Sequence, residues 1–166
     1  MNPTNNQEAL GYLRGLLDGL DYIHRSGYLH RDLTKKNIFF GKDNNIKIGD
    51  FGLAKKLVGS EDYMYCSQSP HPTSIRIGLH RAPELLENEP YTRKSDMYGL
   101  GIIFLEMLLS PLDTAHERIN IIEQIKKGQY PGEWENKFET AVLKKLLAES
   151  PDDRPYADEL IQFIDH

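Results

Sequence analysis

The chain has 166 residues, of which 27% are charged and 39% hydrophobic, as expected for a soluble globular domain with one core. Its net charge of -5 argues against general binding to nucleic acid or to a membrane surface. The single cysteine, Cys66, excludes an internal disulfide and favours a reducing, cytoplasmic location, and neither a signal peptide nor a membrane-spanning apolar run is visible.

Residues 4–25 are predicted to form the first helix, because leucine and isoleucine recur three and four positions apart along one face. Thr4 and Gln7 fit a capping box at its start. Three glycines lie four residues apart on roughly one side of it, at Gly11, Gly15 and Gly19. Each costs about 1 kcal/mol relative to alanine. A close helix contact and an exposed face that tolerates glycine explain them equally well.

A short hairpin is predicted next, with strands at residues 38–40 and 46–48 joined by a polar turn. The flanks of a hairpin meet at its open end, so Asn37 and Asp50 are expected to lie close together there. Two oxygen donors at one place suit Mg²⁺, a hard cation that takes few protein ligands and leaves room for phosphate. Asp32, a few residues before the first strand, is free to orient a hydroxyl.

Residues 30–37 and 50–52 resemble the catalytic loop and the magnesium loop of protein kinases, whose pattern is His-Arg-Asp-Leu-x-x-x-Asn followed by Asp-Phe-Gly. The resemblance implies that Asp32 is the catalytic base and that Asn37 and Asp50 hold Mg²⁺ with ATP. It also implies that the Asp-Phe-Gly phenylalanine packs as a switch. The motif residues with structural or regulatory roles are then His30, Arg31, Phe51 and Gly52.

Residues 50–84 show little periodicity and are rich in Ser, Thr, Tyr, Pro and Gly. A long irregular loop in a compact domain is usually functional or disordered, and the resemblance makes this one an activation segment. Thr73 and Ser74 are the favoured phosphorylation sites because they lie nearest the Ala-Pro-Glu triplet at 82–84. Phosphate there would pair with Arg31 and order the loop. The alternative for each hydroxyl is a solvated side chain without such a role.

Residues 91–109 are predicted to form the most buried helix, since apolar side chains lie on nearly all of its sides. Thr92 or Ser95 can cap it. Asp96 near its start suits the positive end of the helix dipole. The resemblance implies that Asp96 also bonds the backbone of the catalytic loop, which is compatible with the first interpretation. Three further helices are expected at residues 114–128, 138–149 and 156–164.

Arg154 by itself would be interpreted as a surface charge. The resemblance instead implies that it forms a buried ion pair with Glu84. Removing one partner of such a pair is destabilising by several kcal/mol, because the other charge stays buried without compensation.

The resemblance covers residues 8–164 and is to the C-terminal lobe of a Ser/Thr protein kinase. Within that superfamily, the chain is most similar to kinases of the alpha subunit of translation initiation factor two, in particular the amino-acid-starvation sensor. The segments that suggest this are residues 37–39, 46–54, 94–98, 100–107 and 114–118. The implied fold is mainly α-helical, a single partial kinase-like domain over residues 1–166 with a small β-hairpin at the catalytic loop.

The sequence near the site departs from the family pattern at Thr34 and in the segment before Ala82. Thr34 stands where Ser/Thr kinases carry a lysine that touches the transferring phosphate. Lys36 stands where tyrosine kinases place a basic residue, and it is predicted to steady the phosphate instead. Counting back from Glu84 places Ile77 and His80 at the family's Thr and Tyr. In the family that Thr bonds the catalytic Asp and the missing lysine, so hydroxyl specificity stays open.

Nothing before the first helix resembles the Gly-rich loop, the strand lysine or the helix glutamate of a kinase, so the N-terminal lobe is expected to be absent. The first functional hypothesis is an ATP- and Mg²⁺-dependent protein kinase, with the initiation-factor alpha subunit as the suggested protein substrate. Its activity would need an N-terminal lobe from another chain or a longer native protein.

The second hypothesis is an inactive interaction module that binds a full-length kinase, or the substrate of that kinase, through the face that the missing lobe would cover. The third is a fragment, left by gene decay or by a start codon assigned too late. Retention of Asp32, Asn37 and Asp50 favours the first hypothesis, since folding alone does not demand all three. No nucleic-acid or membrane partner is expected.

Overall fold

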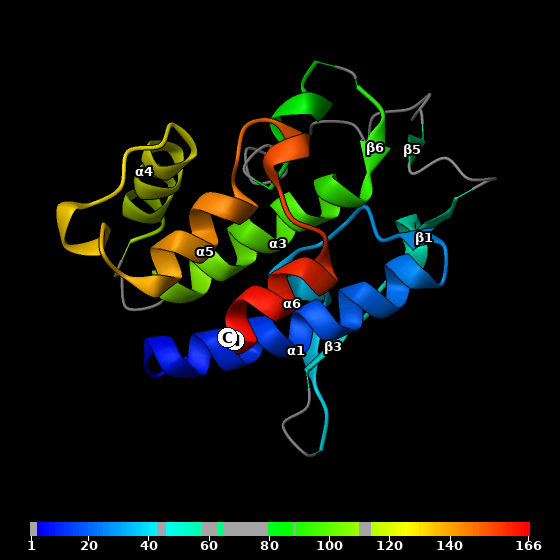
Figure 1. The fold of residues 1–166 in the computed structure, drawn as a ribbon, viewed down its shortest axis with the longest axis horizontal. Coiled ribbons are helices and arrows are strands. Elements are labelled where there is room, and N and C mark those ends of the chain that lie inside the picture. The colour runs from blue at the N-terminus through cyan, green and yellow to red at the C-terminus, as the bar shows by residue number, and fades with distance from the viewer. Residues whose placement is uncertain (1–2, 43–45, 58–62, 65–79, 88, 110–113) are drawn as a thin grey trace.

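The computed structural model describes residues 3–42, 46–57, 63–64, 80–87, 89–109 and 114–166. The described residues are mostly helical with a few short strands, as the sequence predicts (Figure 1). The α-helices are α1 (Asn6–Arg25), α3 (Arg93–Leu108), α4 (Ala115–Lys126), α5 (Phe138–Leu146) and α6 (Ala157–Asp165). Single turns of 3-10 helix lie at Lys35–Asn37, Phe51–Leu53, Pro83–Leu85, Gly132–Trp134 and Pro151–Asp153.

The strands form three antiparallel pairs rather than one sheet. They are β1 (Tyr28–Leu29) with β4 (Lys55–Lys56), β2 (Ile38–Phe40) with β3 (Ile46–Ile48), and β5 (Tyr63–Met64) with β6 (Tyr91–Thr92). The β2–β3 hairpin has the predicted bounds. The other two pairs are only two residues long, which is too short for alternating hydrophobicity to reveal.

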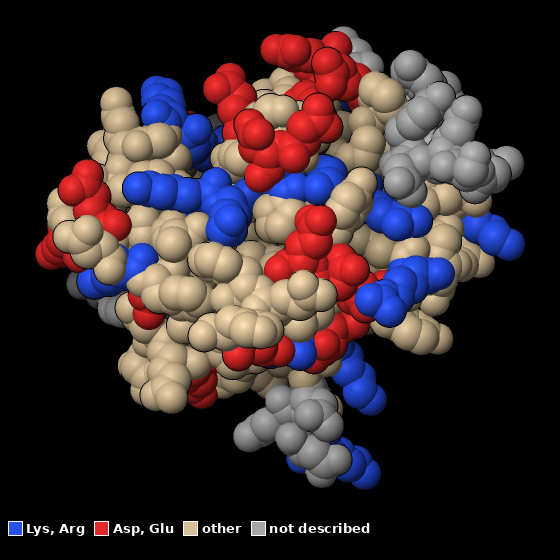
Figure 2. All heavy atoms as spheres, viewed as in Figure 1, with Lys and Arg blue, Asp and Glu red and all other residues tan. Residues whose placement is uncertain are grey.

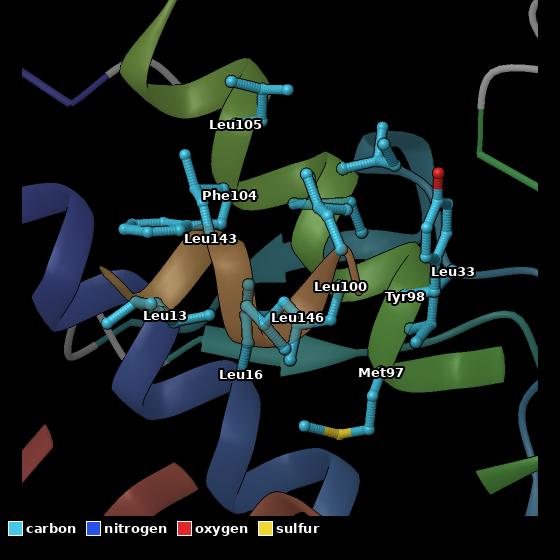
Figure 3. Packing of buried hydrophobic residues seen from close by; sticks show 14 of the residues in the cluster. Leu13, Leu16, Leu33, Met97, Tyr98, Leu100, Phe104, Leu105, Leu143 and Leu146 are labelled. Atoms are coloured by element: carbon cyan, nitrogen blue, oxygen red, sulfur yellow. The ribbon is translucent and has the colours of Figure 1, made fainter. Parts of the chain in front are cut away.

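Helix α3 lies at the centre of the domain, and α1, α4 and α5 pack around it (Figure 1). Its side chains are buried from Ser95 to Met107 with the exception of Glu106. The cap at its start is Thr92, whose Oγ1 accepts a hydrogen bond from the Lys94 amide at 3.1 Å. Figure 3 shows side chains of α3 interleaved with those of α1 and α5 in the core. The prediction of a central helix is confirmed.

Helix α1 begins one residue later than the predicted capping box requires, so that prediction is wrong in detail. Asn5 is the cap, and its Oδ1 accepts a hydrogen bond from the Glu8 amide at 2.9 Å. The Glu8 carboxylate reaches back to the Thr4 amide at 2.6 Å. Asparagine caps helices at least as well as threonine, so Asn5 takes the capping role predicted for Thr4, and the Glu8 carboxylate accepts from the Thr4 amide.

Two of the three α1 glycines face the hairpin. A Cβ on Gly15 would lie 3.6 Å from Ile46 Cβ, and one on Gly19 would lie 3.4 Å from Ile48 Cδ1, whereas nothing lies within 4 Å of Gly11. A contact therefore exists at Gly15 and Gly19, but it is made with strand β3 rather than with another helix, and it has ordinary van der Waals distances. Gly11 fits the alternative of an open face.

Gly101 and Gly11 should respond oppositely to replacement by alanine. A Cβ on Gly101 would lie 2.8 Å from atoms of Leu146 and Leu147, where α3 meets α5. We expect Gly101→Ala to lower the free energy of unfolding by about 1–3 kcal/mol through overpacking. Gly11→Ala should raise it by about 1 kcal/mol through helix propensity. Urea unfolding of both variants measures the difference, and equal effects would contradict the packing described.

Figure 2 shows acidic and basic side chains interspersed over one face of the molecule, so the described residues there form no continuous basic stripe. Among the described residues, no helix combines the length and the apolar character needed to cross a membrane.

Candidate active site

The hairpin places Asn37 and Asp50 at its open end. Ile38 pairs with Ile48, and one step further the Gly49 amide donates a hydrogen bond to the Asn37 carbonyl at 2.8 Å. The backbone of Asn37 is thereby fixed beside the residue that precedes Asp50. This is the arrangement that the hairpin pattern predicts.

The Asn37 side chain holds Asp32 in place. Its Nδ2 donates to the Asp32 carbonyl at 2.8 Å and to Asp32 Oδ2 at 2.9 Å. Asn37 is buried, whereas Asp32 is half-buried. The carboxylate is therefore oriented by a rigid neighbour and remains open to a reactant. Both bonds use the Asn37 nitrogen, which leaves its Oδ1 for a cation.

Asp50 lies on the other flank in a left-handed conformation, with φ of 58°. Its Oδ1 accepts a hydrogen bond from the Gly52 amide at 3.2 Å, and its side chain is exposed. A left-handed conformation is uncommon for a residue other than glycine, and such strain gathers at functional sites. The turn aims a carboxylate outward next to the Asn37 flank.

His30 joins the loop to the hairpin. Its ring is buried, with Nε2 3.0 Å from the Gly49 carbonyl, while Nδ1 lies 3.3 Å from the Asp32 amide. One neutral tautomer satisfies both contacts, because Nε2–H donates to the carbonyl and Nδ1 accepts from the amide. The ring of Phe51 lies 5.3 Å from the His30 ring, although Phe51 itself is exposed.

Asp96 at the start of α3 fixes the backbone of the loop that carries Asp32. It accepts hydrogen bonds from the His30 and Arg31 amides at 2.9 and 3.0 Å, and from the Tyr91 hydroxyl at 2.7 Å. His24 Nε2 lies 2.9 Å away. Burial alone would raise the pKa of Asp96, but these partners outweigh it and lower that pKa. The bond from the Arg31 amide holds this residue where it adopts a left-handed conformation with φ of 70°.

The bonds from Asp96 to the loop backbone match what the resemblance implies, but His24 and Tyr91 were not anticipated. His24 follows Leu20 by four residues, so it lies on the apolar face of α1. A polar residue on a buried helix face was the available signal. Its partner is 72 residues away, and no local pattern could name it.

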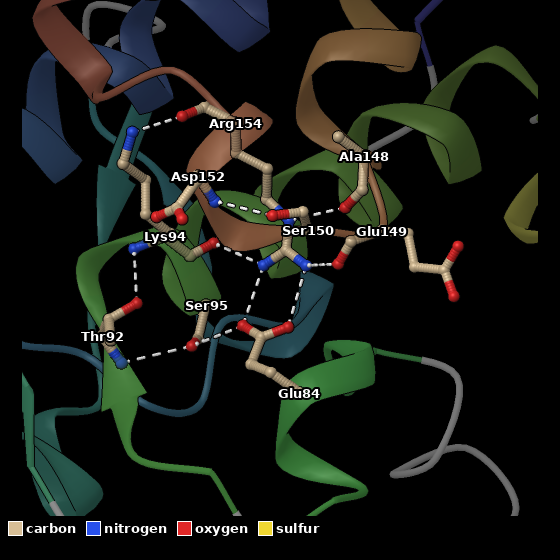
Figure 4. A network of polar contacts seen from close by, with 9 residues as sticks. All are labelled: Glu84, Thr92, Lys94, Ser95, Ala148, Glu149, Ser150, Asp152 and Arg154. Carbon is tan, nitrogen blue, oxygen red and sulfur yellow. Dashed lines mark hydrogen bonds and ion pairs between the residues drawn. The ribbon is translucent and has the colours of Figure 1, made fainter.

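Glu84 and Arg154 form the expected buried pair (Figure 4). Two parallel bonds of 2.8 Å join the guanidinium to the carboxylate, and the two residues are only 1% and 5% exposed. Ser95 Oγ also donates to Glu84 at 2.8 Å. Arg154 further donates to three backbone carbonyls, those of Lys94, Ala148 and Glu149.

Acid should weaken the fold through Glu84. Burial alone would raise the pKa of Glu84, but the bonds from Arg154 outweigh it, so the pKa is lowered. A lowered folded-state pKa gives stability that is present above the unfolded value of about 4.3 and lost as pH falls through the folded value. The free energy of unfolding in urea should therefore fall between about pH 5 and pH 3. Glu84→Gln should lose part of that dependence, and an unchanged pH slope would contradict this assignment.

Other predicted site residues are placed less tightly. Lys36 is exposed, and no ion pair is recorded for it within the described residues. Thr34 precedes the turn Lys35–Asn37, and its side chain makes no capping bond there. Thr73, Ser74, Ile77 and Cys66 lie outside the described residues. The activation segment at residues 50–84 thus stays a prediction.

The donors present fit Mg²⁺. No cluster of three or more His, Cys, Asp or Glu side chains that could hold a metal occurs in the described part of the chain. Asn37 Oδ1 and the exposed Asp50 carboxylate instead supply two hard oxygen donors. Mg²⁺ is usually bound by one or two protein side chains together with water and phosphate oxygens, so a site with two such ligands suits it.

Residues 2–163 match the family model described as the protein kinase domain. The chain is 40% identical to "eIF-2-alpha kinase GCN2" of Arabidopsis thaliana over 97% of its length, which is 14% of that protein. It is 36% identical to the human protein of that name, with 90% of this chain and 10% of that protein aligned. It is 35% identical to the mouse "Interferon-induced, double-stranded RNA-activated protein kinase", with 90% and 27% aligned. The chain spans between a tenth and about a quarter of the length of these relatives.

Proposed function

We propose that this chain, which belongs to the protein kinase domain family, transfers the terminal phosphate of ATP to a serine or threonine hydroxyl of a protein. The supporting observation is the oriented Asp32 carboxylate, held by Asn37 at 2.9 Å beside the open end of the hairpin. Phosphoryl transfer depends mainly on positioning and on electrostatic stabilisation. A fixed, accessible carboxylate next to two oxygen ligands for a cation provides the positioning.

In the proposed mechanism, Asp32 accepts a hydrogen bond from the substrate hydroxyl and takes its proton as the phosphate transfers. Asn37 Oδ1 and Asp50 would hold Mg²⁺, which neutralises phosphate charge when it is bound with ATP. The exposed Lys36 ammonium would steady the transferring phosphate in place of the lysine that Thr34 replaces. Asp96 and His30 keep the loop rigid, so that Asp32 does not have to be ordered during the reaction.

The proposal includes a lobe that covers the nucleotide, supplied by a longer form of this polypeptide or by a second chain. The residues assigned above would hold the metal and the hydroxyl, whereas kinases use further residues to cover the phosphates. Without that lobe, transfer should be slower by orders of magnitude. A cytoplasmic location is part of the same proposal.

The alpha subunit of translation initiation factor two is the proposed substrate, because several relatives carry that substrate in their names. The test is incubation of the native protein, purified from its own cells, with ATP, Mg²⁺ and that subunit, followed by mass spectrometry of the product. We expect one phosphorylated hydroxyl, and no transfer after chelation of Mg²⁺. Phosphate found only on other proteins would refute the proposed substrate. The absence of any Mg²⁺-dependent transfer would refute the proposed kinase activity.

An inactive interaction module is the second candidate, favoured by exposed apolar side chains near the hairpin. The exposed fractions are 53% for Phe39, 44% for Phe40, 51% for Phe51 and 47% for Leu53. Such a surface invites a partner. If this candidate is right, Asp32→Asn leaves the cellular phenotype unchanged, whereas charged replacements of Phe39 and Phe40 abolish it.

A further inference from the structure

We propose that Glu106 is a positioning residue that ties the loop carrying Asp32 to the segment entering Ala82, through Lys35 on one side and His80 on the other. Its effect on catalysis rests on the proposed function, whereas the link itself does not. Glu106 lies on α3 and is the residue that interrupts its buried run. It lies on the element that both segments pack against.

Lys35 connects the loop to Glu106. Its Nζ donates to the Glu106 carbonyl at 3.1 Å and lies 3.9 Å from Glu106 Oε2. Lys35 follows Asp32 by three residues and precedes Asn37 by two. Its ammonium is therefore committed to α3 and is not free to hold a phosphate. This leaves that role to Lys36 and gives Lys35 a different one.

His80 reaches the same carboxylate from the other segment. Its Nε2 lies 3.6 Å from Glu106 Oε1, an ion-pair distance when the ring is protonated. Its Nδ1 is buried and has no hydrogen-bond partner among the described residues. Glu106 is consequently the polar group that holds this ring in the described part of the chain.

Both segments pack against α3 at Gly99. A Cβ on Gly99 would lie 3.5 Å from Leu33 Cβ, 3.8 Å from the Leu33 carbonyl and 4.0 Å from the His80 carbonyl. The backbones at residues 33 and 80 therefore lie against the same point of the helix, about two turns before Glu106. Glu106 provides a polar link at a place where the backbones already converge.

The basic groups around Glu106 favour the ionised form of its carboxylate. Burial by itself would raise the pKa of Glu106, but His80, Lys35 and Arg118 outweigh that effect, so the pKa is lowered. The carboxylate is thus ionised near neutral pH. One partly buried anion among three basic groups is costly to remove, because Lys35 would be left partly buried with its carboxylate partner gone.

The test is hydrogen exchange of the full chain, comparing wild type with Glu106→Gln by mass spectrometry. We expect peptides over residues 30–40 and 80–87 to exchange about three- to tenfold faster in the variant, and α1 and α6 to stay unchanged. Lys35→Met should reproduce the faster exchange of residues 30–40. Lys35→Arg, which keeps the positive charge, should exchange at nearly the wild-type rate. Asp18→Asn, which removes an exposed carboxylate partner of Arg14, is the matched control and should change neither peptide.

Unchanged exchange in both peptides would overturn the proposal, whether or not the protein transfers phosphate. If Glu106→Gln does not fold, Lys35→Met and His80→Gln carry the same test, each on its own segment. In a kinase assay, Glu106→Gln should raise the KM for the protein substrate about tenfold while the KM for ATP stays within about twofold. Equal changes in both KM values would indicate general damage and would also overturn it. If the wild-type protein transferred no phosphate, the proposed function would be refuted, but the link through Glu106 would not.

Discussion

Replacing Asp32 by Asn is expected to lower the rate of phosphate transfer by about 10²- to 10⁴-fold. The substitution preserves the shape of the side chain and an oxygen that can accept the hydrogen bond from Asn37 Nδ2, which Asp32 Oδ2 receives at 2.9 Å. The loop should therefore keep its geometry, while the carboxylate that we propose as the proton acceptor is lost. Initial rates with saturating Mg²⁺ and ATP measure the effect, and thermal unfolding verifies the fold.

Asp18→Asn is the matched control, since it makes the same chemical change at an exposed position on α1. It should leave the rate unchanged. If Asp32→Asn retained the wild-type rate, Asp32 would not be the base, and the phosphate transfer would come from another site or another protein. If wild type and variant were both inactive with a lobe-supplying partner present, the interaction module would become the better explanation.

Local sequence patterns predict the elements of this fold well where the signal is itself local. The β2–β3 hairpin was predicted with its observed bounds, because the apolar triplet Ile38–Phe40 and the alternating Ile46–Ile48 flank a polar turn. The central helix was predicted at residues 91–109 and is observed at Arg93–Leu108. The error at the start of α1 arises because Thr4 and Asn5 are both good caps, and the structure uses Asn5, which accepts from the Glu8 amide.

The links between distant segments could not be predicted from local patterns. The contacts of Asp96 with the loop and of Arg154 with Glu84 were expected only through the family resemblance. His24 and Glu106 carried no such expectation, and their partners are 72 and 71 residues away. Each is a polar side chain on an otherwise apolar helix face, which is a signal for a buried partner but does not identify it.

Several of these links start from the same helix. Asp96, Glu106 and Ser95 all belong to α3, and each contacts a segment that carries or borders the candidate site. A rigid, buried helix can therefore hold irregular loops in place where the loops themselves have little regular structure. The left-handed conformation of Arg31 persists for this reason, since its amide is bonded to Asp96, whereas the turn at Asp50 is stabilised locally by the Gly52 amide.

Replacing Arg154 by Met is expected to lower the free energy of unfolding by about 3–5 kcal/mol. The variant leaves the buried Glu84 carboxylate with Ser95 as its remaining side-chain partner. It also removes the donors to the carbonyls of Lys94, Ala148 and Glu149. Urea unfolding at pH 7 measures the loss. Arg14→Gln, which removes the ion pairs that the partly exposed Arg14 side chain makes with Asp18 and Asp165, is the control and should cost less than about 1 kcal/mol.

Glu84→Gln should cost less than Arg154→Met, about 1–3 kcal/mol, because Arg154 keeps its three carbonyl acceptors and the glutamine oxygen can still accept one of its bonds. The double variant Glu84→Gln/Arg154→Met should be little worse than Arg154→Met alone, since the uncompensated carboxylate is then gone. The coupling energy from this cycle isolates the pair from the carbonyl contacts. Additive single effects would mean that Glu84 and Arg154 do not act as a pair, and that the carbonyl bonds alone explain why Arg154 is buried.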